Sequence, residues 1–334
     1  MKAVGYHHSG AIDALVDLDI PMPEPGPRDL LVRVKAVSVN PVDVKTRAGS
    51  APQDGPRILG YDAAGVVERV GSDVTLFAPG DAVFYAGAID RPGSDAEYHL
   101  VDERIVGAKP DSLDWTAAAA LPLTALTAFE LLFDRMRVPF GSFTAGGTLL
   151  VINGAGGVGS ILIQLARRLT GLRVAATASR PETIAWVRSL GAHDVIDHHR
   201  PLDAELARIG IGQADYVAGL TATDRHIEAI ARLIAPQGTL ALIDDPETLD
   251  IVPFKRKAVT IAWELMFTRS LFHTPDMARQ GVILNEIAAL VDAGVLRSTM
   301  TQDAGPLTAE NLRRAHATVE SGNAYGKIVL SGIA

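Results

Sequence analysis

The stretch LLVINGAGGVGS, residues 149–160, joins an apolar run to a glycine-rich loop. The apolar run predicts a buried strand, and residues 156–169 that follow, GGVGSILIQLARRL, predict a helix. A G-x-G-x-x-G spacing in this context allows a tight turn, close approach of a pyrophosphate to the backbone, and close packing of helix on strand. We therefore expect the helix N-terminus to face the phosphates of a dinucleotide. The cofactor-binding candidates are Gly154, Gly156, Gly157, Val158 and Gly159.

Strand-like and helix-like segments alternate beyond this loop. Helices are predicted at 181–191, which begins with proline and ends with glycine, and at 224–234. Because strands that alternate with helices form a parallel sheet with right-handed crossovers, we expect a doubly wound α/β domain. The strands predicted for it lie at 173–179, 193–197, 214–220, 238–245 and 258–267.

The N-terminal third of the chain has a different pattern. Short strand-like runs separated by Gly and Pro predict a β-rich domain there. Residues 112–133 are rich in alanine and leucine and predict two helices that meet at Pro122. After a helix at 277–294, the strand-like GKIVL, residues 326–330, is expected to return to the β-rich domain. The N-terminal runs are 30–39, 63–71, 81–87 and 96–103.

Composition narrows the function classes. The 334 residues, 48% of them hydrophobic, favour two domains with sizeable cores. A net charge of −8 argues against nucleic acid or an anionic membrane as a partner. The absence of cysteine excludes disulfides, thiolate zinc sites and cysteine nucleophiles. The N-terminal MKAVGYHHSG lacks the apolar core of a signal peptide, so we expect a cytoplasmic protein.

The residues that follow the strand at 173–179 indicate which dinucleotide binds. An NAD site would place a carboxylate here against the ribose hydroxyls, whereas this chain has Ser179 and Arg180. A hydroxyl and a guanidinium suit the 2′-phosphate of NADP, because arginine binds phosphate through paired hydrogen bonds. His198, after the next strand, is a further candidate for that phosphate. The sequence thus predicts NADPH, with a solvated Arg180 as the alternative.

Several segments together carry a family resemblance: VSVNPVDVKTRAG, LGYDAAGVVERVG, GSDAEYHLV, LPLTALTAFELL, VINGAGGVGS, ATASRPETIAWVRSLGA and GKIVL. Over essentially its whole length the chain resembles the medium-chain dehydrogenase/reductase superfamily. Within it, the chain is similar to the zinc-independent quinone oxidoreductase branch, often labelled zinc-type alcohol dehydrogenase-like. The resemblance implies a GroES-like, β-rich catalytic domain built from 1–119 and 291–334. It also implies an inserted Rossmann domain at 120–290, with the substrate in the cleft.

The resemblance also bears on metal binding. Zinc-dependent relatives hold the catalytic metal with Cys, His, and Cys or Asp. Asn40, Tyr61 and Leu123 stand at those places, and Asp62 replaces the glutamate after the histidine. These side chains are poor ligands for Zn²⁺, and the four cysteines of the family's structural zinc lobe are missing. The resemblance therefore implies a metal-free catalytic site, with a weak site formed by Asp43, Asp62 and a histidine as the alternative.

Without a Lewis acid, oxidation of an unactivated alcohol is harder, whereas quinones and α,β-unsaturated carbonyls accept hydride readily at carbon. The Asn40 amide, the Tyr61 hydroxyl and the Lys45 ammonium are candidates to stabilise the resulting oxyanion. In zinc relatives the position of Lys45 carries the proton-relay histidine. Asp43 is a fourth catalytic candidate, and Thr127 matches the family position beside the nicotinamide.

Each candidate also has a purely structural interpretation. Asn40 could cap its turn, and Tyr61 could line the cleft with its hydroxyl bonded to water. Asp43 could hold its loop through backbone hydrogen bonds. Lys45 could be solvated, and Thr127 could pack within its helix.

The favoured hypothesis is an NADPH-dependent, zinc-independent reductase of quinones or activated alkenes. The alternative is a weakly active NADPH-binding protein that senses redox state or binds a partner, and a zinc-dependent alcohol dehydrogenase is a distant third. The apolar TIAWELMF, residues 260–267, predicts an exposed sheet edge. We therefore expect a homodimer.

Overall fold

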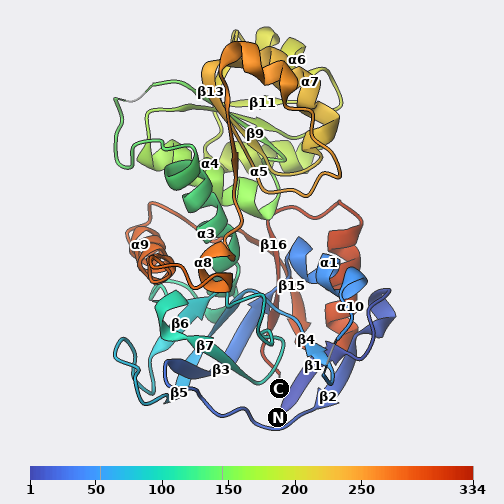
Figure 1. The fold of residues 1–334 in the computed structure, drawn as a ribbon, viewed down its shortest axis with the longest axis vertical. Helices are drawn as coiled ribbons and strands as arrows, with labels where there is room; N and C mark the ends of the chain where they lie inside the picture. Colours follow the sequence, from blue (N-terminus) through green and yellow to red (C-terminus); the bar gives the residue numbers. More distant parts are fainter. Residues whose placement is uncertain (53, 145, 334) are drawn as a thin grey trace. The chain divides into compact units, whose positions relative to one another are not determined.

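The computed structural model describes residues 1–52, 54–144 and 146–333. The chain divides into two compact units, which we call the first unit, Met1–Leu126 with Phe267–Ala334, and the second unit, Thr127–Met266. Both chain termini lie in the first unit (Figure 1). The fold therefore matches the expected architecture, a β-rich domain formed by both chain ends with an α/β domain inserted between them.

The second unit is built on a six-stranded sheet in which all neighbouring strands are parallel. Helices connect its strands (Figure 1), so the doubly wound arrangement predicted from the alternating pattern is present. In spatial order the strands are β11 (Asp194–Ile196), β10 (Arg173–Thr177), β9 (Thr148–Ile152), β12 (Ala214–Gly219), β13 (Ile234–Leu242) and β14 (Thr260–Trp263). The helical elements are η3 (Glu130–Arg135), α4 (Gly157–Leu169), α5 (Pro181–Leu190), α6 (Leu202–Arg208), α7 (Thr223–Leu233) and η4 (Val252–Lys257).

An apolar core packed on the sheet stabilises this unit. Leu150, Val217 and Leu240, on the three adjacent strands β9, β12 and β13, are fully buried in one apolar cluster. Ile230 of α7 belongs to the same cluster. Burial of such side chains contributes about 1.5–3 kcal/mol each, so the continuous apolar runs of these strands specify the sheet.

The first unit contains a seven-stranded and a three-stranded sheet. The C-terminal strand β16 pairs antiparallel with β3, Val329 opposite Ser38, as the GKIVL segment predicted. The larger sheet contains β15 (Met300–Pro306), β16 (Lys327–Ser331), β3 (Asp29–Ser38), β5 (Ala63–Val70), β6 (Ala82–Tyr85) and β8 (Val106–Ala108), with β7 (Tyr98–Asp102) on β3. The smaller contains β2 (Val16–Asp19), β1 (Lys2–Tyr6) and β4 (Arg57–Ile58).

Helices of the first unit include two that the sequence analysis did not predict. Helix α1 is short and lacks an apolar stripe, and α10 is amphipathic and packs against α1. The helical elements are η1 (Ile12–Ala14), α1 (Pro41–Gly49), η2 (Glu103–Ile105), α2 (Trp115–Ala119), α8 (Thr268–Leu271), α9 (Arg279–Asp292) and α10 (Ala309–Glu320). Helix α3 (Pro122–Phe129) begins at the predicted proline and runs across the unit boundary.

The unit boundary differs from the predicted one near residue 290. Helix α9 lies with the first unit, where it packs on β8 and η2. A Cβ on Gly281 would come within 2.8 Å of the carbonyl oxygens of Arg104 and Val106, so glycine permits this close approach. The Asn285 side chain also accepts a hydrogen bond of 2.8 Å from the Ala108 N–H. These contacts are long-range, and the helical pattern of α9 does not reveal them.

One helical stretch, Trp115–Arg135, is long and apolar enough to cross a membrane by length and composition alone. Of its most apolar eighteen-residue window, 83% is buried inside the protein. Such burial is typical of the core helix of a globular protein.

Candidate active site

The Asp62 carboxylate is the centre of a buried hydrogen-bond network in the first unit. Its Oδ2 accepts hydrogen bonds from Ser38 Oγ at 2.9 Å and Asn40 Nδ2 at 2.7 Å. Its Oδ1 accepts one from the backbone N–H of Leu123 at 2.7 Å. Lys327 Nζ lies 3.0 Å from Oδ2. Asp62 is fully buried, so these donors replace the water that a carboxylate needs.

The Lys327 ammonium is the cation of this network, although the sequence analysis did not select it. Besides Asp62, its Nζ donates to the Val39 carbonyl at 2.8 Å and to Asn40 Oδ1 at 2.5 Å. An ammonium has three donors, and these three oxygens satisfy them. The side chain is 3% exposed. The sequence does contain a signal for Lys327: it is a single lysine in the apolar strand GKIVL, and a buried lysine requires a partner.

Asn40 is a structural residue in this arrangement. Its carbonyl oxygen accepts from Lys327, and its amide nitrogen donates to Asp62 and, at 3.5 Å, to the Ser38 carbonyl. Both polar atoms of the Asn40 side chain are therefore hydrogen-bonded, and the side chain is buried. This corrects the expectation that its amide is offered to an oxyanion. It occupies the N-cap of α1, as its alternative interpretation anticipated.

Asp43 holds the same turn through backbone hydrogen bonds. Its Oδ2 accepts from the Asn40 N–H at 2.7 Å and its Oδ1 from the Gly60 N–H at 3.1 Å. Burial raises the pKa of Asp43 above its usual range, against the opposing effect of these bonds and of Lys327. The neighbouring Asp95 is also buried, and burial together with the Asp43 carboxyl raises the pKa of Asp95 well above its usual range.

Tyr61 differs from its neighbours because its buried hydroxyl makes no well-formed hydrogen bond among the described residues, although the Arg57 side chain lies near it. The side chain is 1% exposed and packs edge-on against Phe267, with ring centroids 5.4 Å apart. Burial, together with the Asp43 charge, raises the pKa of Tyr61 to about 12, and the nearby Arg57 guanidinium only partly opposes this. The phenol thus keeps its proton at neutral pH and remains a hydrogen-bond donor.

Gly60 fixes the position of Tyr61 and Asp62. Its φ of +106° lies in the left-handed region, and a Cβ there would come within 2.7 Å of Asp95 Oδ1 and Ser94 Oγ. Any other residue would be strained and would collide with this loop. The glycine before the Tyr61–Asp62 pair is therefore required by the turn that brings Asp62 into the network.

The two remaining candidates, Lys45 and Thr127, lie on helices α1 and α3. Lys45 is exposed on α1, whereas Asn40, Asp43 and Tyr61 are buried. Thr127 is buried in α3 and belongs to the second unit.

A catalytic zinc does not fit these residues. Asn40 has both polar atoms occupied, Tyr61 has a strongly raised pKa and Leu123 offers no ligand atom. Lys327 already places a positive charge against Asp62 and Asn40, and that charge opposes a divalent cation. Among the described residues no group of three or more His, Asp or Glu side chains is arranged to hold a metal.

The glycine loop of the second unit fits a dinucleotide phosphate. A Cβ on Gly154 would come within 2.7 Å of the Ala176 side chain, and one on Gly159 within 2.4 Å of the Asn153 carbonyl. Gly156, the N-cap of α4, leaves the helix N-terminus open, and Gly157 and Val158 begin the helix. The left-handed residue of the turn is Asn153, with φ +65°, rather than Gly154. Gly154 is instead needed for close contact with β10.

Ser179 follows β10 at the edge of a groove of about 230 Å³ that Arg188, Arg200 and Arg208 also line. Arg180 lies at the N-cap of α5, with its Nε 3.1 Å from Glu182 Oε1. The Ala178 N–H donates to the Ile196 carbonyl at 3.0 Å, which brings the ends of β10 and β11 together. The predicted residues Ser179, Arg180 and His198 therefore follow adjacent strand ends.

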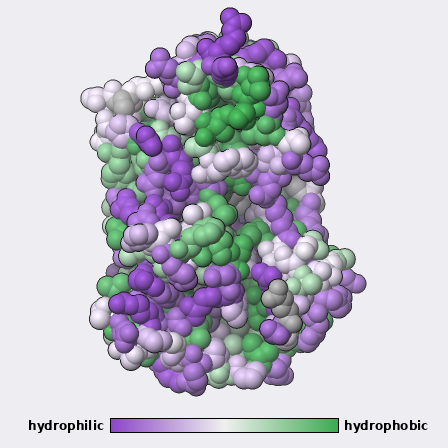
Figure 2. All heavy atoms as spheres, in the orientation of Figure 1, coloured by the Kyte–Doolittle hydropathy of each residue, from purple (hydrophilic) through white to green (hydrophobic). Residues whose placement is uncertain are grey.

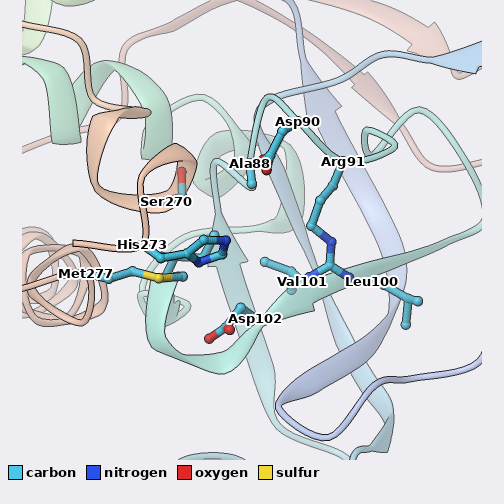
Figure 3. Close-up of a pocket in the computed structure, with 10 residues that line it drawn as sticks. Ala88, Asp90, Arg91, Leu100, Val101, Asp102, Ser270, His273 and Met277 are labelled. Atoms are coloured by element: carbon cyan, nitrogen blue, oxygen red, sulfur yellow. The ribbon is translucent and has the colours of Figure 1, made fainter. Parts of the chain in front are cut away.

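A second cavity, of about 40 Å³, lies in the first unit (Figure 3). Two of its charged side chains are bonded to neighbours: Arg91 donates two hydrogen bonds to Asp29, and Asp102 accepts from Arg104. The volume suits water molecules rather than a cofactor. Its walls include Ala88, Ser270, His273 and Met277.

Comparisons with known proteins identify relatives of both units. The family models "Zinc-binding dehydrogenase" and "Alcohol dehydrogenase GroES-like domain" match residues 190–330 and 26–111. A zinc-type alcohol dehydrogenase-like protein of Staphylococcus aureus is 42% identical over 92% of each chain. The NADPH-dependent alkenal/one oxidoreductase of Arabidopsis thaliana is 38% identical over 71% of this chain and 64% of its own. The crystal structure of a putative zinc-dependent alcohol dehydrogenase protein from Rhizobium etli has a TM-score of 0.95 and 57% identity, covering 100% of this chain and 98% of that one.

We predict that Lys327→Met destabilises the protein strongly, because it leaves the buried Asp62 carboxylate without its cation. Loss of one partner of a buried pair costs about 3–5 kcal/mol, measurable by urea unfolding. The double variant Lys327→Met/Asp62→Asn should recover part of this loss, since it removes the uncompensated charge.

Lys2→Met is the matched control, because Lys2 pairs with Asp19 at 2.9 Å on the surface. It should leave the unfolding midpoint nearly unchanged. Equal midpoints for Lys327→Met and Lys2→Met would contradict the central place of Lys327.

Proposed function

This chain belongs to the medium-chain dehydrogenase/reductase superfamily, in its quinone oxidoreductase-like branch, and on that premise we propose that it is an NADPH-dependent, zinc-independent reductase of quinones or α,β-unsaturated carbonyls. The observation that carries the proposal is the buried Tyr61 hydroxyl, which stands outside the hydrogen-bonded network beside it and has the Arg57 side chain near it. That network is unsuited to zinc. The name of the Arabidopsis relative, an NADPH-dependent alkenal/one oxidoreductase, supports the same class of substrate.

The chemistry follows from the missing Lewis acid. NADPH, when bound, supplies a hydride that an enone accepts at its β-carbon or a quinone at its ring. Negative charge then develops on the substrate oxygen, and a fixed hydrogen-bond donor stabilises that charge more in the transition state than in the ground state. Oxidation of a plain alcohol would instead need a group that stabilises an alkoxide, which zinc supplies in other members of the superfamily.

Tyr61 is the donor in this proposal. Its raised pKa of about 12 keeps the phenol protonated, and a substrate carbonyl would satisfy the hydroxyl. Asp62, Asn40 and Asp43 act indirectly, because they hold the turn that positions Tyr61. Lys45, exposed on α1, remains a candidate to deliver the proton that completes reduction of an alkene.

The preference for NADPH is proposed from the end of β10. No carboxylate follows this strand directly, and Ser179 and Arg180 offer a hydroxyl and a guanidinium to a 2′-phosphate. The contact of Arg180 with Glu182 at 3.1 Å reduces the positive charge that Arg180 can offer.

We propose that the enzyme acts in the cytoplasm, as expected from its sequence.

The function is tested with enzyme dialysed against a chelator and shown by elemental analysis to be free of zinc. We predict that it oxidises NADPH in the presence of enones, enals or quinones, and that Tyr61→Phe lowers kcat about 10²–10³-fold while the Kd for NADPH stays unchanged. Tyr98→Phe is the control, since Tyr98 lies on β7 outside the network.

Three results would argue against the proposal. Activity lost on chelation and restored by zinc would make the enzyme metal-dependent. Tight NADPH binding without turnover of any acceptor would favour a redox sensor. An unchanged kcat in Tyr61→Phe would remove Tyr61 from the mechanism.

A homodimer is proposed from the free edge of the six-stranded sheet. β14 is the last strand in its order, and Trp263 and Leu265 at its end are 54% and 52% exposed. Ile251 and Val252, at the start of η4, are also exposed. Figure 2 shows hydrophobic residues gathered in the upper part of the face in view. An unpaired apolar edge favours pairing with a second copy.

We predict a dimer in sedimentation velocity at micromolar concentration and a monomer for Trp263→Lys, because the lysine places a charge in the apolar edge. Leu76→Lys, at another exposed leucine, is the matched control and should remain dimeric. A monomeric wild-type protein would refute the proposal.

A further inference from the structure

Three histidines gather at the carboxyl edge of the sheet in the second unit. His198 and His199 follow β11, and their ring centroids are 4.3 Å apart. His226 lies in the first turns of α7, near enough to contribute to lowering the pKa of His198. His198 Nδ1 is buried without a hydrogen-bond partner among the described residues. A buried ring nitrogen without a partner is costly and points to a missing one.

The cluster lies beside the predicted place of the 2′-phosphate. Thr177 of β10 is paired with Ile196 of β11 in parallel register, so Ser179 and His198 follow neighbouring strand ends. In sheets of this kind ligands bind outside the carboxyl ends of the strands. A phosphate at Ser179 would therefore lie within reach of the loop that carries His198.

The groups on the loop itself act on the pKa of His198 in both directions: beyond the effect of burial, His199 lowers it and the Asp197 carboxylate raises it. Asp197 Oδ1 accepts a hydrogen bond of 2.9 Å from the His199 N–H, and Arg200 approaches Asp197 at 3.9 Å. Glu205 of α6 is bonded to Arg208 at 2.8 Å, and Arg200 also approaches it at 3.8 Å. The Asp197 and Glu205 carboxylates are thus paired with arginines or hydrogen-bonded to the backbone.

The elements packed around the loop add both signs of charge. On α7, Asp224 raises and Arg225 lowers the pKa of His226, and burial makes the net shift downward. On the β10–α5 side, Arg180 is paired with Glu182. Burial, then His199, likewise lower the pKa of His198, so this ring is neutral in the cofactor-free protein at neutral pH.

We propose that His198, supported by His199 and His226, binds the 2′-phosphate of NADPH and takes up a proton from solvent when it does so. The inference rests on the proposed preference for NADPH and deepens it. A phosphate monoester carries nearly two negative charges at pH 7, and a nearby anion favours the charged imidazolium. The N–H of that imidazolium then donates to the phosphate, and NADH, which lacks the phosphate, causes no such uptake.

The direction of proton exchange on NADPH binding distinguishes a phosphate site that contains a histidine from one formed by arginine alone. The second pKa of a phosphate monoester is about 6, and contact with a permanently charged guanidinium lowers it further. A site formed by arginine alone would therefore release protons on binding NADPH. Net uptake requires a group that gains a proton, and a neutral histidine is such a group.

The experiment is isothermal titration calorimetry of the whole protein with NADPH and with NADH at pH 7, in two buffers with different ionisation enthalpies. We expect NADPH to bind with uptake of roughly half to one proton and NADH with none. His198→Gln should abolish the uptake and raise the Kd for NADPH about tenfold without changing that for NADH. His226→Gln should reduce the uptake. His8→Gln, at an exposed histidine of the first unit, should behave like wild type.

The outcomes distinguish the two proposals. Preferred NADPH binding with no net exchange or with proton release, or uptake that persists in His198→Gln, overturns the histidine inference and leaves the NADPH preference intact. Equal affinity for NADPH and NADH overturns both.

Discussion

The first unit depends on the hydrogen bonds and the ion pair of the buried Asp62 carboxylate. Its donors come from β3, the N-cap of α1, the start of α3 and β16, so one buried side chain joins both ends of the chain. A buried carboxylate is stable only when its charge is paired and its lone pairs are bonded. Each donor is therefore required, and the C-terminal strand must return to the N-terminal sheet to supply Lys327.

This network also determines the available chemistry. It includes Asn40, which stands at a position that the family resemblance associates with a metal ligand, and the Asn40 amide accepts a hydrogen bond from the Lys327 ammonium. Tyr61 remains outside the network because its neighbours Gly60 and Asp62 fix the turn. In the proposed mechanism, catalysis relies on a donor that keeps its proton rather than on a Lewis acid, which favours acceptors that are already electrophilic.

Local patterns predicted most of the fold, and long-range contacts account for the errors. The glycine loop, the alternating strands and the break at Pro122 all appear as the sequence indicated. Helix α1 was not predicted because it has no apolar stripe, and α9 was expected in the second unit because periodicity does not reveal a packing partner. The role given to Asn40 was wrong for a related reason: its partner Lys327 is 287 residues away. The catalytic role of Tyr61, proposed from its position in the sequence, stays a prediction.

The most direct test of the account is the fate of a deuterium label. Zinc-free enzyme is supplied with NADPH deuterated at C4 of the nicotinamide and with an enone, and the product is analysed by NMR. The account predicts a saturated ketone with deuterium at the former β-carbon, and Tyr61→Phe should form it more slowly. Deuterium at the carbonyl carbon of an allylic alcohol would contradict it, because that product requires the carbonyl reduction typical of an alcohol dehydrogenase.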